Sequence, residues 1–189
     1  MKLYFIRHGQ TAWNLEGKIQ GSKDVALNSK GIIQAEQLSE KIVESNYKIS
    51  KIYSSQQKRA IKTAEILSES INTEYIVVNG LEEVNLGEWE GLTWEKAQEK
   101  YPLAFDEWFN NRRYTKPPQG ESYQDMLNRV LITLQVIVNN NTEDVAIVKH
   151  SAVIMTLQCY ITNTPFEDMT RFKTDNTSIT EIDSELICL

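Results

Sequence analysis

The chain has 189 residues, enough to bury one good-sized core, and we expect a single domain over 1–189. Apolar residues make up 41% of it and charged residues 24%, as in ordinary globular proteins. The formal net charge of −6 argues against a general nucleic-acid or anionic-membrane surface, and no stretch approaches the ~20 apolar residues of a membrane span. The apolar run at 3–6 is too short for a signal peptide, and Cys159 and Cys188 lie in no CxxC pair or metal-ligand cluster, so we expect a cytoplasmic protein.

The first part of the chain alternates short apolar runs with stretches of helical spacing. The apolar runs predict strands over 3–6, 52–54 and 75–78. The helical spacing predicts a helix from 28 or 29 to about 44, capped by Asn28 or Ser29, and another over 57–70, capped by Ser54 and Ser55. This β-α-β-α-β order indicates an α/β fold with a mostly parallel central sheet and helices on both faces, a three-layer α/β/α sandwich.

The order changes after the third strand. We interpret residues 81–121 as a small helical cap inserted at the carboxyl edge of the sheet, with short helices over 93–99 and 102–110. This segment contains three of the four tryptophans: Trp89, Trp94 and Trp108. Beyond it the pattern predicts a helix over 122–138, a buried strand over 145–148, a helix over 151–161 and an antiparallel edge strand over 178–182.

Two of the predicted strands end in a histidine. Arg7 and His8 follow the first strand, and Lys149 and His150 follow the strand over 145–148. In open α/β sheets, ligands bind outside the carboxyl ends of the strands, so we expect these side chains at a ligand site. One such histidine could be a structural residue, but two at one sheet edge, one of them beside an arginine, indicate function.

Arg59 adds a second guanidinium near this edge, because it falls in the first turn of the helix over 57–70. A surface arginine that reaches outward is the alternative. Guanidinium groups bind phosphate oxygens bidentately and stay charged at neutral pH, so Arg7 and Arg59 with two histidines predict a phosphate site. No Asp-x-Asp or His-Glu cluster indicates a metal, and we expect no metal and no cofactor.

An acidic run over 81–91 follows the third strand. Most glutamates in such a run are solvated loop charges. Cleavage of a phosphate ester needs a proton for the leaving oxygen, however, and a carboxylic acid at the sheet edge could supply it.

Several motifs follow one another along the chain. They are Arg7-His8-Gly9-Gln-Thr-x-Trp-Asn14, Gln20-Gly21, Asp24-x-x-Leu27-x-x-x-Gly31, Tyr53-Ser54-Ser55-x-x-x-Arg59-Ala60-x-x-Thr63-Ala64, Glu83-x-x-x-Gly87-x-Trp89-Glu90-Gly91, Gly120-Glu121-Ser122 and His150. Over about residues 3–182, this series resembles the histidine phosphatase superfamily, in its phosphoglycerate-mutase-like branch.

The resemblance implies a role for each matching residue. His8 would be the nucleophile that becomes phosphohistidine. The phosphoryl oxygens would be held by Arg7, Arg59 and His150. Asn14 and Gln20 would assist from the opening loop. Glu83 would be the acid, because it has the spacing of the family to the following glycine and Glu82 does not.

The chain departs from the family pattern around the second histidine. The family usually has glycine after it, whereas Lys149 and Ser151 flank His150 here. Ser151 could cap the next helix or add a hydroxyl to the phosphate site, and Lys149 could add positive charge or point away. Arg112 and Arg113 resemble a mutase segment whose arginines meet the substrate carboxylate, with two solvated arginines as the alternative.

The resemblance implies a metal-independent phosphomonoesterase that acts on small-molecule phosphate esters through a phosphohistidine. The short segments between Glu83 and His150 and after the last strand favour hydrolysis over a mutase, which must keep water from its phosphohistidine. The alternatives are a phosphoglycerate mutase and a non-catalytic phospho-ligand-binding domain. The layout looks most like α-ribazole phosphatases and broad-specificity phosphatases, so α-ribazole 5′-phosphate is one candidate substrate. We expect no nucleic-acid or membrane partner, and a monomer or homodimer.

Overall fold

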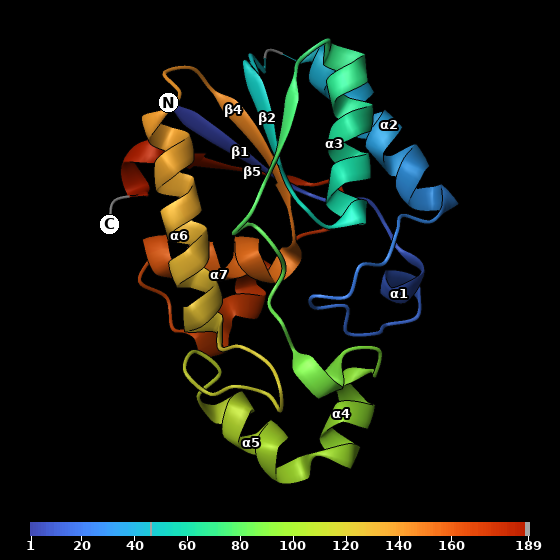
Figure 1. Cartoon of the computed structure of the whole chain (residues 1–189), viewed down its shortest axis with the longest axis vertical. Helices are drawn as coiled ribbons and strands as arrows, with labels where there is room; N and C mark the ends of the chain where they lie inside the picture. The colour runs from blue at the N-terminus through green and yellow to red at the C-terminus, as the bar shows by residue number, and fades with distance from the viewer. Residues whose placement is uncertain (46, 188–189) are drawn as a thin grey trace.

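The computed structural model describes residues 1–45 and 47–187, and this part of the chain contains a five-stranded sheet (Figure 1). Its strands are β1 (Lys2–Arg7), β2 (Lys51–Ser55), β3 (Tyr75–Val78), β4 (Val145–Lys149) and β5 (Ile179–Asp183). They lie in the order β3-β2-β4-β1-β5. Neighbouring strands are parallel except β5, which pairs with β1 antiparallel at the edge. The predicted mostly parallel sheet with an antiparallel edge strand is therefore confirmed.

Six of the helices match the prediction to within about one residue. They are α2 (Ser29–Glu44), α3 (Lys58–Ile71), α4 (Trp94–Lys100), α5 (Pro102–Asn110), α6 (Tyr123–Asn139) and α7 (Ser151–Ile161). Their periodic apolar faces made them visible in the sequence. Four short elements lacked enough turns to show a period: α1 (Ala12–Leu15) and the 3₁₀ turns Gly87–Trp89, Phe166–Phe172 and Ser184–Leu186.

Side chains cap three of these helices. Those of Asn28, Thr93 and Ser122 accept hydrogen bonds from the first turns of α2, α4 and α6. Ser151 does not cap α7, because it is the first residue of that helix and the preceding His150 makes no side-chain cap bond. The prediction that Ser54 and Ser55 cap α3 is wrong. Both serines lie inside β2, and the residue that precedes α3 makes no side-chain cap bond.

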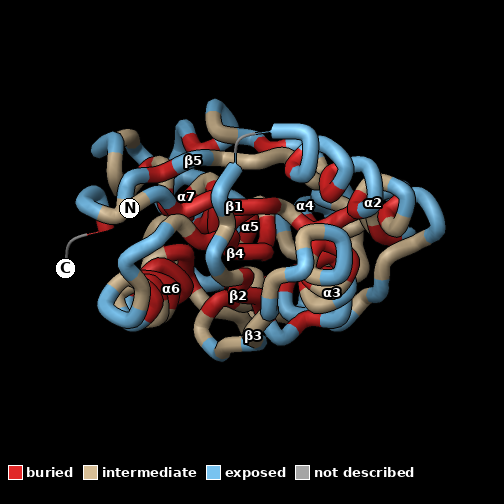
Figure 2. Tube along the Cα trace, turned by 90° about the horizontal axis from the view of Figure 1, so that it is seen from above, coloured by how far each residue is buried: buried red, intermediate tan, exposed pale blue. Residues whose placement is uncertain are grey.

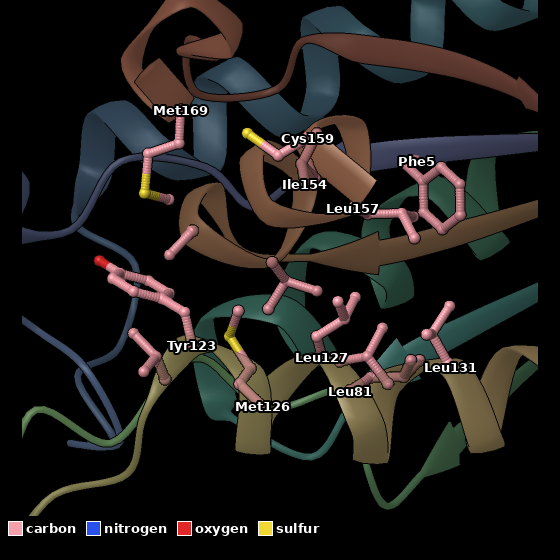
Figure 3. Packing of buried hydrophobic residues seen from close by; sticks show 14 of the residues in the cluster. Phe5, Leu81, Tyr123, Met126, Leu127, Leu131, Ile154, Leu157, Cys159 and Met169 are labelled. Atoms are coloured by element: carbon pink, nitrogen blue, oxygen red, sulfur yellow. The ribbon is translucent and has the colours of Figure 1, made fainter. Parts of the chain in front are cut away.

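Helices cover both faces of the sheet, as the side chains of β1 show. Leu3 and Phe5 belong to a large apolar cluster with residues of α6 and α7 (Figure 3). Tyr4 and Ile6 point to the other face, where they pack in a second cluster with residues of α2 and α3. Figure 2 shows the buried central strands between the two pairs of helices. Because both faces are buried, the apolar run of β1 is continuous rather than alternating.

The segment after β3 leads to α4 and α5, which lie beyond the carboxyl ends of the parallel strands (Figure 1). Aromatic rings form the interior of this cap. Trp94 stacks on Trp108 with ring centroids 5.4 Å apart, and Trp89 meets Trp108 edge to face at 5.3 Å. Such contacts add to the apolar burial of the rings. The buried rings of the cap belong to the same large apolar cluster as Leu3 and Phe5, so the cap and the sheet share one core.

The loop after β1 packs tightly on the first turn of α2, and two glycines make this possible. A Cβ on Gly9 would lie 2.3 Å from the carbonyl oxygen of Gly31, and a Cβ on Gly31 would lie 2.1 Å from that of Gln10. Any larger residue would push these backbones apart. None of the described helices is long and apolar enough to cross a membrane.

Candidate active site

His8 lies at the carboxyl end of β1, and its ring is held from both sides. Its Nδ1 lies 2.7 Å from the carbonyl oxygen of Gly9. A carbonyl can only accept, so Nδ1 carries the proton and donates it, and Nε2 keeps its lone pair. Arg59 Nε donates to that Nε2 at 3.2 Å. Burial, reinforced by the positive charge of Arg59, lowers the pKa of His8 well below its usual 6.5, so the imidazole is neutral at neutral pH.

Two arginines flank His8. The guanidinium of Arg59 is fully buried and donates to the carbonyl oxygens of Lys23 at 2.6 Å and Gly21 at 2.9 Å. Its burial lowers the pKa of Arg59 to about 10, so it remains a cation at neutral pH. Arg7 donates through Nη1 to the carbonyl of Thr174. Each arginine is thus fixed by backbone carbonyls, which neutralise no charge and leave the pocket positive.

His150 stands behind His8, at the start of α7. The centroids of the two imidazole rings are 5.2 Å apart, and Nε2 of His150 forms a 2.9 Å hydrogen bond with Ser55 Oγ. Its Nδ1 is buried and has no hydrogen-bond partner among the described residues. Burial, with the positive charge of Arg59, lowers the pKa of His150 well below 6.5. The structure therefore brings both histidines together, as their positions in the sequence predict.

Glu83 is the acidic residue that meets this pocket. Its Oε1 accepts from the backbone N–H of Val84 at 3.0 Å, and its Oε2 accepts from that of Ala152, in the first turn of α7, at 3.1 Å. Burial raises the pKa of Glu83 above 4.5, although the two hydrogen bonds from backbone N–H groups act to lower it. Glu82 instead pairs with Arg129 at 3.3 Å. The geometry thus agrees with the spacing that favours Glu83.

These groups surround a cavity of about 210 Å³, which we call the phosphate pocket. Seven of the predicted site residues line it: Arg7, His8, Asn14, Gln20, Arg59, Glu83 and Ser151. Thr11 organises the opening loop, because its hydroxyl donates to Gln20 Oε1 at 2.8 Å and its N–H to Asn14 Oδ1 at 3.1 Å. His150 does not line the pocket and reaches it only through His8.

The side chains of the two arginines after α5 lie in different surroundings. Arg112 is buried over Trp108 and lines a second cavity of about 410 Å³ that adjoins the phosphate pocket. Arg113 lines neither cavity; its Nε donates to Gln124 Oε1 at 2.8 Å. The sequence could not separate these neighbours, because the turn after α5 sends their side chains in different directions.

Lys149 points away from the phosphate pocket. Its Nζ lies 3.9 Å from the ring centroid of Phe5, in the apolar layer under α6 and α7, and has no hydrogen-bond partner among the described residues. Burial lowers the pKa of Lys149 well below 10.5. Of the two alternatives for Lys149, positive charge at the site or a side chain that points away from it, the structure shows the second. Cys159 is buried as a free thiol, and Cys188 lies outside the described residues.

Sequence reasoning missed Gln57 and Asn176. Gln57 Nε2 donates to the carbonyl of Gly21 at 3.1 Å, and its Oε1 accepts from the N–H of Glu83 at 2.9 Å, so it joins the opening loop to the acid. Asn176 donates to the carbonyl oxygen of His8 at 2.9 Å. Both lie in irregular segments without periodicity, and only long-range contacts reveal them. Within the described part of the chain, no group of three or more His, Cys, Asp and Glu residues is placed to hold a metal.

The sequence and the fold of this chain match those of known proteins. A family model described as the histidine phosphatase superfamily (branch 1) matches residues 3–186. This chain belongs to the histidine phosphatase superfamily. The putative phosphoserine phosphatase 2 of Hydrogenobacter thermophilus is 32% identical to this histidine phosphatase over 184 residues, which cover 97% of this chain and 90% of the relative.

Solved structures of other superfamily members have the same fold. The phosphoserine phosphatase of Entamoeba histolytica, in complex with 3-phosphoglyceric acid, is 30% identical and superposes with a TM-score of 0.81 over 95% of this chain and 89% of that chain. The α-ribazole phosphatase of Shigella flexneri is 25% identical, with a TM-score of 0.84 over 97% and 90%. The family and these relatives support phosphatase activity for this chain.

Proposed function

We propose that this histidine phosphatase hydrolyses small-molecule phosphate monoesters without a metal, through a phosphohistidine on His8. The observation that carries the proposal is the fixed state of that imidazole. Its Nδ1 proton is held by the carbonyl of Gly9, and its pKa is lowered by burial. Its Nε2 therefore carries the lone pair that attacks, and this lone pair accepts from Arg59 Nε until the phosphoryl group takes its place.

In the first step, Nε2 of His8 attacks phosphorus and the bond from phosphorus to the ester oxygen breaks. The electron pair of that bond goes to the leaving oxygen, which takes the proton of the Glu83 carboxyl group. Glu83 must be protonated for this step, and the raised pKa of this buried carboxyl supports that role. The product alcohol then departs and leaves Glu83 as a carboxylate.

In the second step, the Glu83 carboxylate takes a proton from water while the water oxygen attacks phosphorus. The bond from phosphorus to Nε2 breaks, its electron pair returns to His8, and inorganic phosphate is released. One carboxyl group therefore serves as acid and then as base, so the enzyme returns to its starting protonation state.

The remaining residues stabilise the phosphoryl group as charge spreads over its oxygens. Arg7 and Arg59 provide two fixed guanidinium groups beside His8, the arrangement that phosphoryl transfer requires when no metal neutralises the charge. Asn14, Gln20 and Ser151 offer polar groups from the rim of the same pocket. His150 supports His8 from behind, with the centroids of the two rings 5.2 Å apart.

The substrate class follows from the pocket and from the relatives. Phosphoserine and α-ribazole 5′-phosphate are candidates, because similar proteins carry these substrates in their names. A mutase is the second candidate, since Arg112 lies beside the pocket where a second charged group of the substrate could bind. We further propose that residues 1–189 form one catalytic unit, with residues 81–121 as its cap, and that the protein is cytoplasmic.

The test is phosphate release from 4-nitrophenyl phosphate and from an alkyl phosphate in the presence of EDTA. Wild-type protein should turn over both, and His8→Ala should abolish turnover of both with an unchanged circular dichroism spectrum. Lys30→Ala, an exposed change on α2, is the control and should keep full activity. Wild-type protein that is quenched in an alkaline denaturant should carry a phosphate on His8 by mass spectrometry, and acid treatment should remove it. Appreciable turnover by His8→Ala would exclude the covalent route. Tight phosphate binding without turnover would indicate a phospho-ligand-binding domain.

A further inference from the structure

The cavity that Arg112 lines, which we call the side cavity, lies between the cap and the carboxyl end of the sheet. Its volume is about 410 Å³, against about 210 Å³ for the phosphate pocket. The two spaces adjoin, because they share the lining residues Arg7, Trp94, Tyr123, Ser151 and Met155. The side cavity is therefore next to the place where the leaving group departs from phosphorus.

The walls of the side cavity are mainly apolar. They come from the cap helices, from α7 and from the 3₁₀ turn Phe166–Phe172, and they include Phe105, Phe109, Met155 and Met169. Figure 3 shows Met169 and Tyr123 at the same end of the large apolar cluster. Three cationic side chains also line the side cavity: Arg7, Arg112 and Lys173. A mainly apolar hollow of this size with a small number of polar groups is typical of a binding site for an organic ligand.

Two observations distinguish this cavity from ordinary cap packing. Phe109 is 54% exposed and Trp94 is 39% exposed, so large rings stand at the cavity edge without protein atoms over them. Arg112 is 93% buried, its guanidinium lies 4.9 Å from the ring centroids of both Trp108 and Phe109, and its Nε has no hydrogen-bond partner among the described residues. A buried donor without an acceptor is costly, so an acceptor atom carried on an otherwise apolar ligand would complete the hydrogen bonding of Arg112.

We propose that the side cavity binds the alcohol part of the substrate, and that the preferred substrates are phosphate monoesters whose alcohol carries an apolar body of at least the size of an aromatic ring. This inference rests on the proposed function, because the phosphate must sit on His8 for the alcohol to enter the side cavity. A two-carbon alcohol would leave most of the cavity filled with water, whereas a ring system would displace that water and cover the exposed faces of Phe109 and Trp94.

The first test compares 2-(2-naphthyl)ethyl phosphate with ethyl phosphate. Both esters release primary alcohols of similar basicity, so a difference in kcat/KM reports contacts with the alcohol part and not the ease of bond cleavage. We expect kcat/KM to be about 10- to 100-fold higher for the naphthylethyl ester. A ratio of one or below overturns the inference, even if both esters are hydrolysed and the proposed function stands. Hydrolysis of neither ester would instead count against the proposed function.

The second test changes the cavity wall at exposed positions that should not disturb folding. Thr170→Trp fills the cavity from the 3₁₀ turn, and Phe109→Ala removes a ring from α5. Each should lower the ratio of kcat/KM for the naphthylethyl ester to that for the ethyl ester by at least about fivefold. The matched controls Glu167→Trp and Leu103→Ala lie on the same elements but do not line the cavity, and should change the ratio by less than about twofold. A ratio unaffected by both wall variants would overturn the inference.

Discussion

At the scale of single residues, the chemistry of the site depends on which atoms carry protons. The carbonyl of Gly9 assigns the proton of His8 to Nδ1, and burial keeps the imidazole neutral. Burial acts in the opposite sense on Glu83, whose pKa it raises, because burial always disfavours the charged form. Burial therefore shifts both groups toward their uncharged forms, His8 toward the neutral base and Glu83 toward the protonated acid.

Replacing Glu83 by glutamine should expose its role as the acid. Glu83→Gln should lower kcat/KM by about 10²–10⁴-fold for an alkyl phosphate, because the alkoxide leaves poorly without a proton. The loss should be much smaller for 4-nitrophenyl phosphate, whose leaving group needs no proton. Glu82→Gln is the matched control and should show neither loss, since Glu82 pairs with Arg129 outside the pocket. If Glu82→Gln gives the leaving-group pattern instead, the acid has been misassigned.

Lys149 is a single residue whose cost to stability can be measured. Its ammonium group sits in the apolar layer against Phe5 without an acceptor, so folding favours the neutral amine. The unfolded chain then binds one proton more than the folded chain between the lowered pKa and about 10.5, so wild-type stability rises with pH across that window.

Lys149→Met should therefore raise the free energy of unfolding by about 2–4 kcal/mol at pH 7. The gain should shrink as the pH rises toward 10.5, where the unfolded lysine also loses its proton. Urea unfolding at several pH values measures both effects. Lys30→Met, at an exposed position on α2, is the control and should leave stability within about 0.5 kcal/mol. A pH-independent gain would show that Lys149 keeps its charge in the folded protein.

At the scale of elements, α6 fixes the loop that carries the acid. Arg129 of α6 donates to the carbonyl oxygens of Gly80, Glu82 and Glu83 at 3.2, 2.8 and 3.1 Å. It also pairs with Glu121 at 2.7 Å, at the other end of the cap. One side chain thus ties together the two segments through which the cap joins the rest of the fold.

Arg129→Met should loosen this loop and misplace the Glu83 carboxyl group. We expect a loss of about 1–3 kcal/mol of stability and a fall of about tenfold in kcat for alkyl phosphates. A positioning role predicts that the fall is smaller for 4-nitrophenyl phosphate, as for Glu83→Gln. Lys41→Met, which removes an exposed cation from α2, should change neither quantity. An equal loss with both substrates would mean that Arg129 supports only the fold.

At the scale of the whole molecule, a protein of net charge −6 has to bind a dianion. The long-range field opposes binding, so the attraction is local and comes from Arg7 and Arg59 within one pocket. Because Arg59 is buried and Arg7 is half-buried, solvent screens them little, and phosphate bound there should stabilise the folded state of the whole chain.

Inorganic phosphate at about 100 times its Kd should raise Tm by about 5–10 °C, which corresponds to about 2.7 kcal/mol for a chain of this size. In Arg59→Met, the same phosphate concentration should raise Tm much less, because one side of the anion site is missing. The rise is measured for each protein from its own Tm without phosphate. Sodium chloride at equal ionic strength should not reproduce the shift in wild-type protein. A shift in Arg59→Met equal to that of the wild type would place Arg59 outside the anion site.

The sequence by itself determined the strands, the six longer helices, the mostly parallel sheet and the groups that meet at its carboxyl edge. Apolar runs marked β1 and β4 as strands buried on both faces, and parallel strands bring their carboxyl ends, with His8 and His150, to one edge. Local hydrogen-bonding preferences also placed Asn28 at the start of α2, since capping needs only neighbouring residues.

Only the tertiary structure decided where individual side chains point. It turned Lys149 into the core, separated Arg112 from Arg113, and brought Gln57 and Asn176 to the site from irregular segments. It also showed that the phosphate pocket adjoins a second, mainly apolar cavity. These outcomes depend on contacts between residues far apart in the chain, and the periodicity of one segment carries no information about what packs against it.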